Sequence, residues 1–222
     1  MSLRVVLEVA PKKSFASALD WPGWARAGRT EDDALRALLN YAPRYAAVAR
    51  RARIAFAQPR TLRGLTVVET LPGDGGTEFG VPGAAARAEE ELLTAAELKR
   101  LIALLRASWA TLDAIARKAK GVKLAKGPRG GGRELDTILD HVLGADRAYT
   151  TQLGGHAPSI TGPSLRRAVQ DALIEAVHAR NRGELPDRGP RGGARWSPRY
   201  AVRRAAWHVL DHAWEIQDRS GT

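Results

Sequence analysis

The stretch LKRLIALLRASWATLDAIARKAKG, residues 98–121, is the part of the chain whose pattern decides the fold. Thr94 and Glu97 precede it at the spacing of a capping box, and Gly121 ends it. Its apolar residues recur at helical spacing and form one stripe: Leu98, Leu101, Leu105, Leu112 and Ile115. The sequence therefore predicts a long amphipathic helix that buries one face against other elements.

Three more helical segments follow, at about residues 134–152, 163–181 and 198–218. Polar or Gly/Pro-rich stretches connect them. Four amphipathic helices with such connections predict an all-α four-helix bundle, which we place at residues 94–222.

The first part of the chain has a different character, which predicts a separate α+β domain at residues 1–82 and a linker at 83–93. Short β-type runs at 3–9 and 14–19 flank a turn, and a third run lies at 65–71. The expected domain is a small sheet with one helix.

That helix begins with an N-cap at Thr30, followed by an acidic residue in the first turn, Asp33. It continues through Tyr41, and Pro43 should bend or restart it. The fold class expected for the whole chain is thus a small α+β unit followed by a four-helix bundle.

Composition excludes several kinds of chemistry. The 222 residues include no cysteine, so disulfides, a protein thiolate nucleophile and thiolate metal ligands are ruled out. The 35 Lys and Arg against 24 Asp and Glu give a formal charge of +11, which favours anionic partners such as nucleic acid or an acidic metabolite. The alternative is that the excess of positive side chains has no functional meaning, because proteins from an arginine-rich proteome carry it on their surfaces in general. No apolar run approaches the roughly 20 residues of a membrane span, so we expect a cytoplasmic protein without membrane contact.

His208 and His212 stand four residues apart in the last helical segment. Residues at this spacing share one helix face, so both imidazoles can reach a single ion. A third ligand must come from another helix, and His141 in the second segment lies at the edge of an apolar stripe. The alternative is that the pair are core histidines satisfied by hydrogen bonds.

The residues around the histidine pair suggest further roles. Glu215 follows His212 by three residues and is the tentative catalytic candidate, either orienting that histidine or accepting a proton. Glu215 and Asp211 could equally be ion-pair partners of Arg204 or Arg219.

The expected metal site is open. A structural zinc ion would need a fourth protein ligand, for which Glu215 is the best placed, whereas a catalytic ion keeps an open position. We expect Trp207 or Trp214 to form a wall of the site. The loops GPRGGGR (127–133) and GPRGGAR (189–195) nearly repeat one another and could act as basic flaps over an anionic ligand, or the likeness is coincidental.

The region from about 90 to 222 resembles the DinB-like (YfiT-like) family of four-helix bundles. Its usual pattern is one histidine on the second helix and an HxxxH pair on the fourth, matched here by His141, His208 and His212. The resemblance implies a divalent metal, zinc or nickel, held by three imidazoles with open positions for water or substrate. It also implies that a low-molecular-weight thiol could be used, which this cysteine-free chain would have to borrow.

The N-terminal region resembles the HicB-like antitoxin fold over about residues 1–60. The likeness rests on the stretch SALDWPGWARAGRTEDDALRALLNYAPRYAAV, with Asp20, Pro22, Gly23, Gly28, Thr30, Glu31 and Ala34 at the matching places. A HicB antitoxin usually carries a DNA-binding segment next, whereas here the histidine-bearing region follows. Trp21 and Trp24 could form an exposed partner surface or stack on bases, or they could cover the sheet against the bundle.

Two functions follow from these patterns. The first is a metal-dependent DinB-like enzyme, a transferase or hydrolase acting on a small anionic substrate, with the HicB-like domain as a lid or a homodimer contact. The second is a HicB-like regulatory or binding protein that recognises a partner protein or nucleic acid and uses the bundle as a scaffold. We favour the first, because three histidines on particular helices are a more demanding pattern than basic charge.

Overall fold

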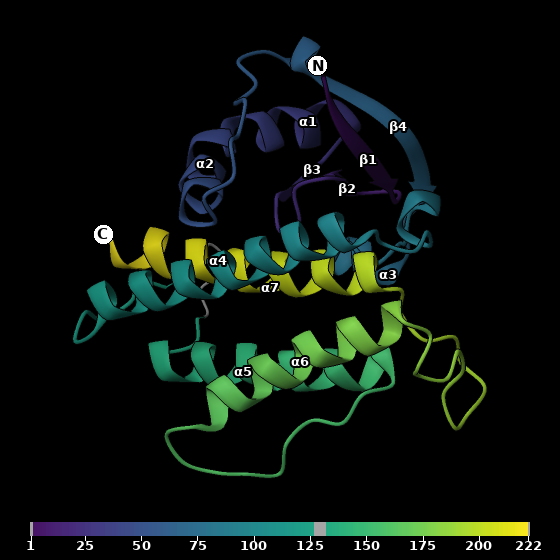
Figure 1. Ribbon diagram of the computed structural model, residues 1–222. Coiled ribbons are helices and arrows are strands. Elements are labelled where there is room, and N and C mark those ends of the chain that lie inside the picture. Colours follow the sequence, from purple (N-terminus) through teal and green to yellow (C-terminus); the bar gives the residue numbers. More distant parts are fainter. Residues whose placement is uncertain (1, 127–131, 222) are drawn as a thin grey trace.

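The computed structural model describes residues 2–126 and 132–221, and it arranges them in layers (Figure 1). The N-terminal sheet and its helices lie on one side, and the helices α4 (Ala95–Ala119) and α7 (Pro198–Ser220) lie in the middle. The helices α5 (Leu135–Leu153) and α6 (Leu165–Asn181) form the opposite side. The protein is therefore α+β, with a sheet followed by long helices, as the sequence predicts.

The N-terminal sheet is mixed and has four strands in the order β3-β2-β1-β4. β1 (Leu3–Val9) pairs antiparallel with β2 (Ser14–Ala18) and parallel with β4 (Leu65–Pro72). Ala10 donates to the carbonyl of Lys13 and closes the hairpin between the first two strands. The three strands expected from the sequence are thus present.

The fourth strand, β3 (Ala25–Gly28), is one that the sequence did not indicate. It follows a Pro-Gly turn and contains few of the residues that favour strands, so its local signal is weak. Pairing with β2 holds it in place, with Phe15 opposite Ala27 and Ser17 opposite Ala25.

Two helices, rather than the one expected, follow β3. Thr30 caps α1 (Glu31–Asn40) through a capping box with Asp33, as predicted. α2 (Ala42–Arg51) begins directly afterwards with Pro43 in its first turn, where a proline is tolerated because the backbone N–H there needs no intrahelical partner. Pro43 therefore restarts the chain as a second helix.

Trp21 and Trp24 lie inside the N-terminal unit. Trp24 stacks on Tyr45 with a ring-centroid separation of 5.5 Å, and the Trp21 ring lies 4.7 Å from that of Phe56. Trp24 also donates its indole N–H to the carbonyl of Leu38. Both tryptophans are buried, so the expectation of an exposed aromatic surface is wrong and the covering role is correct.

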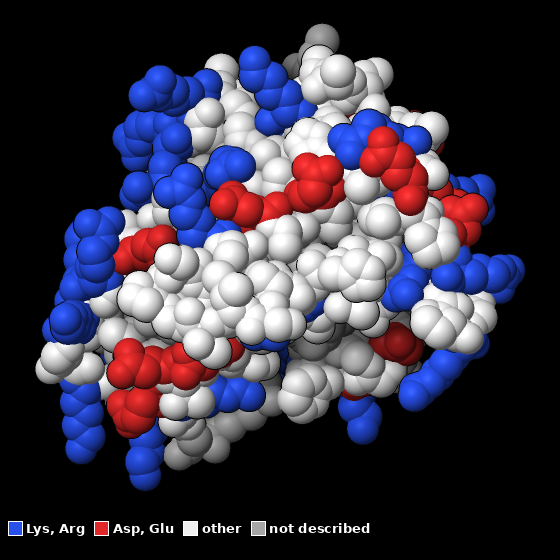
Figure 2. All heavy atoms as spheres, turned by 60° about the horizontal axis from the view of Figure 1, so that its bottom comes forward, with Lys and Arg blue, Asp and Glu red and all other residues white. Residues whose placement is uncertain are grey.

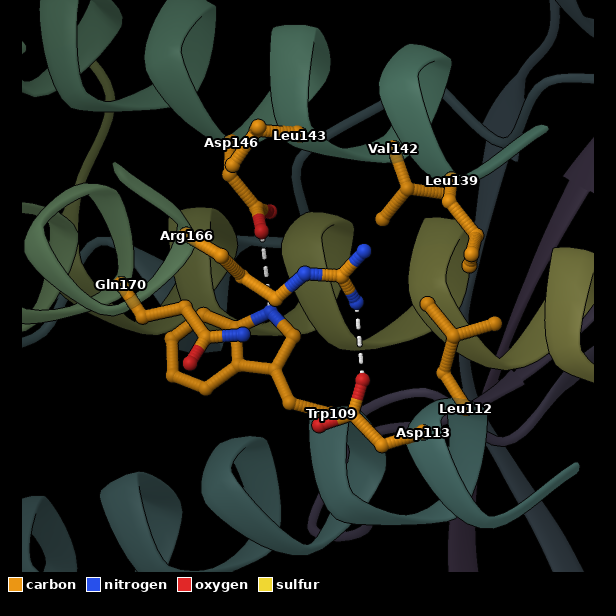
Figure 3. A pocket seen from close by; sticks show the side chains of 9 residues that line it. All are labelled: Trp109, Leu112, Asp113, Leu139, Val142, Leu143, Asp146, Arg166 and Gln170. Carbon is orange, nitrogen blue, oxygen red and sulfur yellow. Dashed lines mark hydrogen bonds and ion pairs between the residues drawn. The ribbon is translucent and has the colours of Figure 1, made fainter. Parts of the chain in front are cut away.

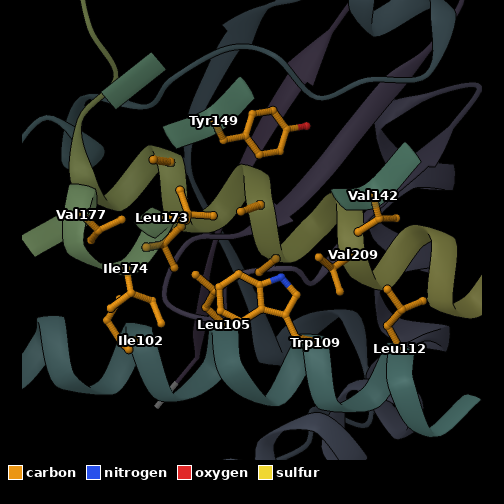
Figure 4. Packing of buried hydrophobic residues seen from close by; sticks show 14 of the residues in the cluster. Ile102, Leu105, Trp109, Leu112, Val142, Tyr149, Leu173, Ile174, Val177 and Val209 are labelled. Carbon is orange, nitrogen blue, oxygen red and sulfur yellow. The ribbon is translucent and has the colours of Figure 1, made fainter. Parts of the chain in front are cut away.

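The four long helices lie where the sequence places them, with small differences at their ends. α4 packs on α7, and α5 packs on both α6 and α7. Figure 4 shows the buried side chains between them, with Trp109 and Leu105 of α4 facing Leu173 of α6 and Tyr149 of α5. α7 is the central helix, because every residue from Pro198 to Leu210 is buried.

The segment 83–93 is packed against both parts of the molecule. It contains a short 3-10 helix (Arg87–Glu89), and Ala86 and Glu89 are almost fully buried. Glu8 of β1 accepts hydrogen bonds from the backbone of residues 83 and 84, and the hydroxyl of Thr77 in α3 (Gly75–Phe79) also donates to it. One buried cluster joins Trp24 and Leu38 to residues of α4 and α7, so the sheet unit and the long helices share a core.

Candidate metal centre

His141 of α5 and His208 and His212 of α7 come together. The Nε2 atoms of His141 and His208 are 3.1 Å apart, and one ring nitrogen from each histidine lies within 4.8 Å of the others. A tetrahedral zinc ion with bonds of about 2.0–2.1 Å holds its ligand atoms about 3.3 Å apart. The group could therefore hold a metal ion after small side-chain adjustments.

Local helix geometry explains the convergence. His208 and His212 lie one turn apart on α7, which places their ring centroids 4.7 Å apart. On α5, the buried residues Ile138 and Val142 anchor the helix against the core. His141 lies beside Val142 and faces α7, with its ring centroid 5.0 Å from that of His212.

Glu215 orients His212. Its Oε2 lies 2.8 Å from Nδ1 of His212, and its Oε1 accepts a hydrogen bond of 2.7 Å from Arg219. The hydrogen bond with His212, together with Arg219, holds the pKa of the Glu215 carboxyl below its usual value despite burial. With Nδ1 engaged, His212 presents Nε2 to the other histidines, a carboxylate–histidine arrangement common at metal sites.

His208 is held in the neutral form that a metal ligand requires. Burial is the main cause, and the neighbouring His212 and His141 add to it, so the pKa of His208 falls to about 2. Burial also lowers the pKa of His141. The Nδ1 of His208 is buried and has no hydrogen-bond partner among the described residues.

The cluster is closed on one side and open on the other. His208 is 9% exposed, His212 is half-buried and His141 is exposed. Both oxygens of Glu215 are engaged by His212 and Arg219, and within the described parts of the chain the metal-ligating group contains three residues. His141 is thus the most accessible of the three histidines.

Several neighbours differ from the expectation. Trp214 packs on Tyr41 and is turned toward the N-terminal unit, whereas Trp207 contacts both Phe15 and His208, with ring centroids 6.2 Å apart in each case. A second ring beside His208 is that of Tyr149 of α5, with centroids 6.0 Å apart. Tyr149 lies eight residues after His141, and nothing in the local pattern marks it as a site residue.

The ion-pair alternatives are resolved differently for the two acidic residues. Asp211 pairs with Arg26 of β3 at 2.9 Å, a partner in the N-terminal unit that the sequence did not suggest. Glu215 pairs with Arg219, as one alternative proposed. His156 follows α5 in a loop and His178 lies in the last turn of α6, and neither belongs to the three-histidine group.

The two glycine-rich loops can be compared only through their described residues. Residues 127–131 of the first loop lie outside the described part of the chain, and Gly132 lies against the Arg219 side chain near the end of α7. The second loop directly precedes α7, and its Arg195 donates to the carbonyl of Thr151 near the end of α5. The described parts of the two loops are therefore at opposite ends of α7.

Charged side chains are dispersed on the face shown in Figure 2. Lys and Arg lie mostly around its rim, Asp and Glu are interspersed with them, and uncharged residues occupy much of the middle. The net charge of +11 is thus not gathered into one basic surface on this face.

A buried carboxyl lies on another face of α5. Asp146 is 2% exposed, accepts a hydrogen bond of 2.9 Å from the indole of Trp109, and has no partner for Oδ1 among the described residues. Figure 3 shows it at a cavity of about 10 Å³, across which Arg166 reaches Asp113. Burial raises the pKa of Asp146 to about 7, more than the Trp109 hydrogen bond lowers it.

Asp146 should make the protein less stable as the pH rises. The folded state keeps the proton up to about pH 7 and the unfolded state loses it near 3.8, so stability falls between these values and then levels off. The Asp146→Asn variant should not show this decrease in stability with pH. At pH 8 its free energy of unfolding should exceed that of wild type by at most about 4 kcal/mol. Urea unfolding at pH 5 and pH 8 measures the free energy of unfolding of both proteins. The Asp140→Asn variant, which changes an exposed carboxyl on the same helix, is the control. Equal pH dependence in wild type and Asp146→Asn would contradict the assignment.

No known family, curated protein or solved structure matches the chain. Among the described residues, no helix combines the length and the apolar character needed to cross a membrane.

Proposed function

We propose that the chain is a metal-dependent enzyme of the DinB-like type, in which His141, His208 and His212 hold one divalent ion, zinc or nickel. The observation that carries the proposal is the convergence of three imidazoles from two helices around one point that is open to solvent. In this proposal α4 to α7 form the DinB-like four-helix bundle at residues 94–222. Residues 1–82 form a HicB-like domain, joined through residues 83–93.

The chemistry fits a transferase or a hydrolase acting on a small molecule. An ion held by the three histidines would supply Lewis acidity for activating water or a low-molecular-weight thiol. Glu215 keeps the proton on Nδ1 of His212 and so fixes the direction of that ring. His208 closes the inner side against water, and the exposed side of His141 admits the substrate.

The alternative, a HicB-like regulator that recognises protein or nucleic acid, has less support. Trp21 and Trp24 were its candidates for contacting a partner, and both side chains are buried. The contacts between the sheet unit and α7, among them the Arg26–Asp211 ion pair, favour an N-terminal domain that supports the helices.

Metal loading tests the proposal. Protein stripped with a chelator and then dialysed against Zn²⁺ or Ni²⁺ should retain about one ion per chain, because three preplaced imidazoles bind such ions without folding of the site. Elemental analysis measures the content. The loaded protein, but not the stripped one, should then consume a thiol such as glutathione with an electrophile, or hydrolyse an activated ester.

The outcomes separate the candidate reactions. Thiol consumption supports the transferase, and ester hydrolysis without thiol supports the hydrolase. Failure to retain either metal would overturn the proposal. Retention of metal with Glu215 as a fourth ligand in a crystal structure would point to a structural ion instead.

A further inference from the structure

Arg204 is a buried cation for which the described residues provide no anionic partner. It lies on α7 one turn before His208 and is 7% exposed. Its Nε and Nη1 atoms are buried and have no hydrogen-bond partner among the described residues. The guanidinium lies over two aromatic rings, with its carbon 4.9 Å from the ring centroid of Trp207 and 5.8 Å from that of Tyr149.

The other buried arginines of α7 are paired, which makes Arg204 an exception. Arg199 pairs with Glu97 at 2.8 Å, Arg203 with Glu89 at 2.5 Å and Arg219 with Glu215 at 2.7 Å. Burying a charge is costly unless it is paired, and contact with aromatic faces compensates only in part. Arg204 thus differs from these three arginines in having no carboxylate partner among the described residues.

The unsatisfied groups around Arg204 gather next to the histidines. The indole nitrogen of Trp207 and the Nδ1 of His208 are also buried and have no hydrogen-bond partner among the described residues. Tyr149 contacts both Arg204 and His208, with its ring 6.0 Å from the His208 ring. A guanidinium and an indole N–H are donors without acceptor character, so the complementary ligand group is an oxyanion.

We propose that Arg204 binds a carboxylate group of the substrate and places that molecule beside the three-histidine site. The proposal rests on the enzyme function above and narrows it: the substrate is a small carboxylate anion. A planar carboxylate matches the planar guanidinium, and Trp207 can add a further hydrogen bond. The Arg204 Nε and Nη1 atoms are buried in this structure, so binding of the carboxylate requires neighbouring side chains to shift.

Calorimetric titration with matched probes tests the proposal. Benzoate and benzamide share a ring and differ in charge, as do acetate and acetamide. Zinc-loaded and zinc-free wild-type protein should both bind a carboxylate more tightly than its amide. Arg204→Met should weaken carboxylate binding by at least about tenfold, leave amide binding unchanged and keep the zinc content of wild type. Arg106→Met, which removes an exposed charge from α4, is the matched control and should bind as wild type does.

Stability provides an independent readout. If Arg204 is kept for binding, replacing it by the apolar Met removes an unpaired buried charge and should leave the melting temperature equal or higher. A lower melting temperature together with unchanged carboxylate binding would show a structural role and overturn the proposal. Wild-type protein without any preference for carboxylates would also overturn it. Loss of zinc binding alone would count against the enzyme function, because the zinc-free titration still reports on Arg204.

Discussion

We expect the His208→Ala substitution to lower the affinity for zinc by more than about 100-fold, a larger effect than the roughly 10–100-fold that losing a contact outside the ligand set usually costs. In the proposed site His208 would supply the innermost ligand, and its burial leaves little room for water to take its place. His141 and His212 alone make a two-ligand site, which holds a divalent ion weakly. Competition with a chromophoric chelator measures the affinity.

Two further variants test whether the loss of zinc affinity is specific to the three proposed ligands. Glu215→Gln should weaken zinc binding by about 10–100-fold, because it disturbs the contact that orients His212 but removes no ligand. His178→Ala removes a histidine of α6 outside the group and should bind zinc as wild type does. Equal zinc affinity in His208→Ala and wild type, both shown to be folded in the metal-free state, would refute the assignment of the ligands.

The second large effect concerns the ion pair that joins α7 to the segment 83–93. Arg203 donates to both oxygens of Glu89, at 2.5 Å and 3.0 Å, and to the carbonyl of Ala84. Glu89 is fully buried and Arg203 is 5% exposed. Glu89→Ala should therefore lower the free energy of unfolding by about 3–5 kcal/mol, because it leaves the guanidinium buried without its counterion.

Urea unfolding checks this value, and an exposed pair supplies the control. Arg36 and Asp32 pair on the surface of α1, so Arg36→Ala should change stability by less than about 1 kcal/mol. The double variant Glu89→Ala/Arg203→Met should be more stable than Glu89→Ala, because no unpaired charge remains. A loss in Glu89→Ala no larger than that of the exposed control would contradict the role given to this ion pair.

The site could be predicted in part. The HxxxH spacing places His208 and His212 on one helix face whatever the rest of the fold does, and His141 was the matching third residue. Tyr149 and Arg204 were not identified as site residues, because their roles depend on which side of α5 meets α7. Trp214, one of the two expected wall residues, faces Tyr41 instead, because the N-terminal unit packs on that side of α7, which the sequence did not indicate.

The sequence alone determined the elements whose signals are local. The capping box at Thr94, the cap at Thr30 and the position of Pro43 specify where helices begin, because each acts through backbone groups only a few residues away. Only the tertiary structure decided the strand β3, the central position of α7 and which buried arginine of α7 has no carboxylate partner in the described parts of the chain. These features arise from contacts between residues far apart in the chain. Such contacts cannot be recognised from the local sequence pattern of the segments that make them.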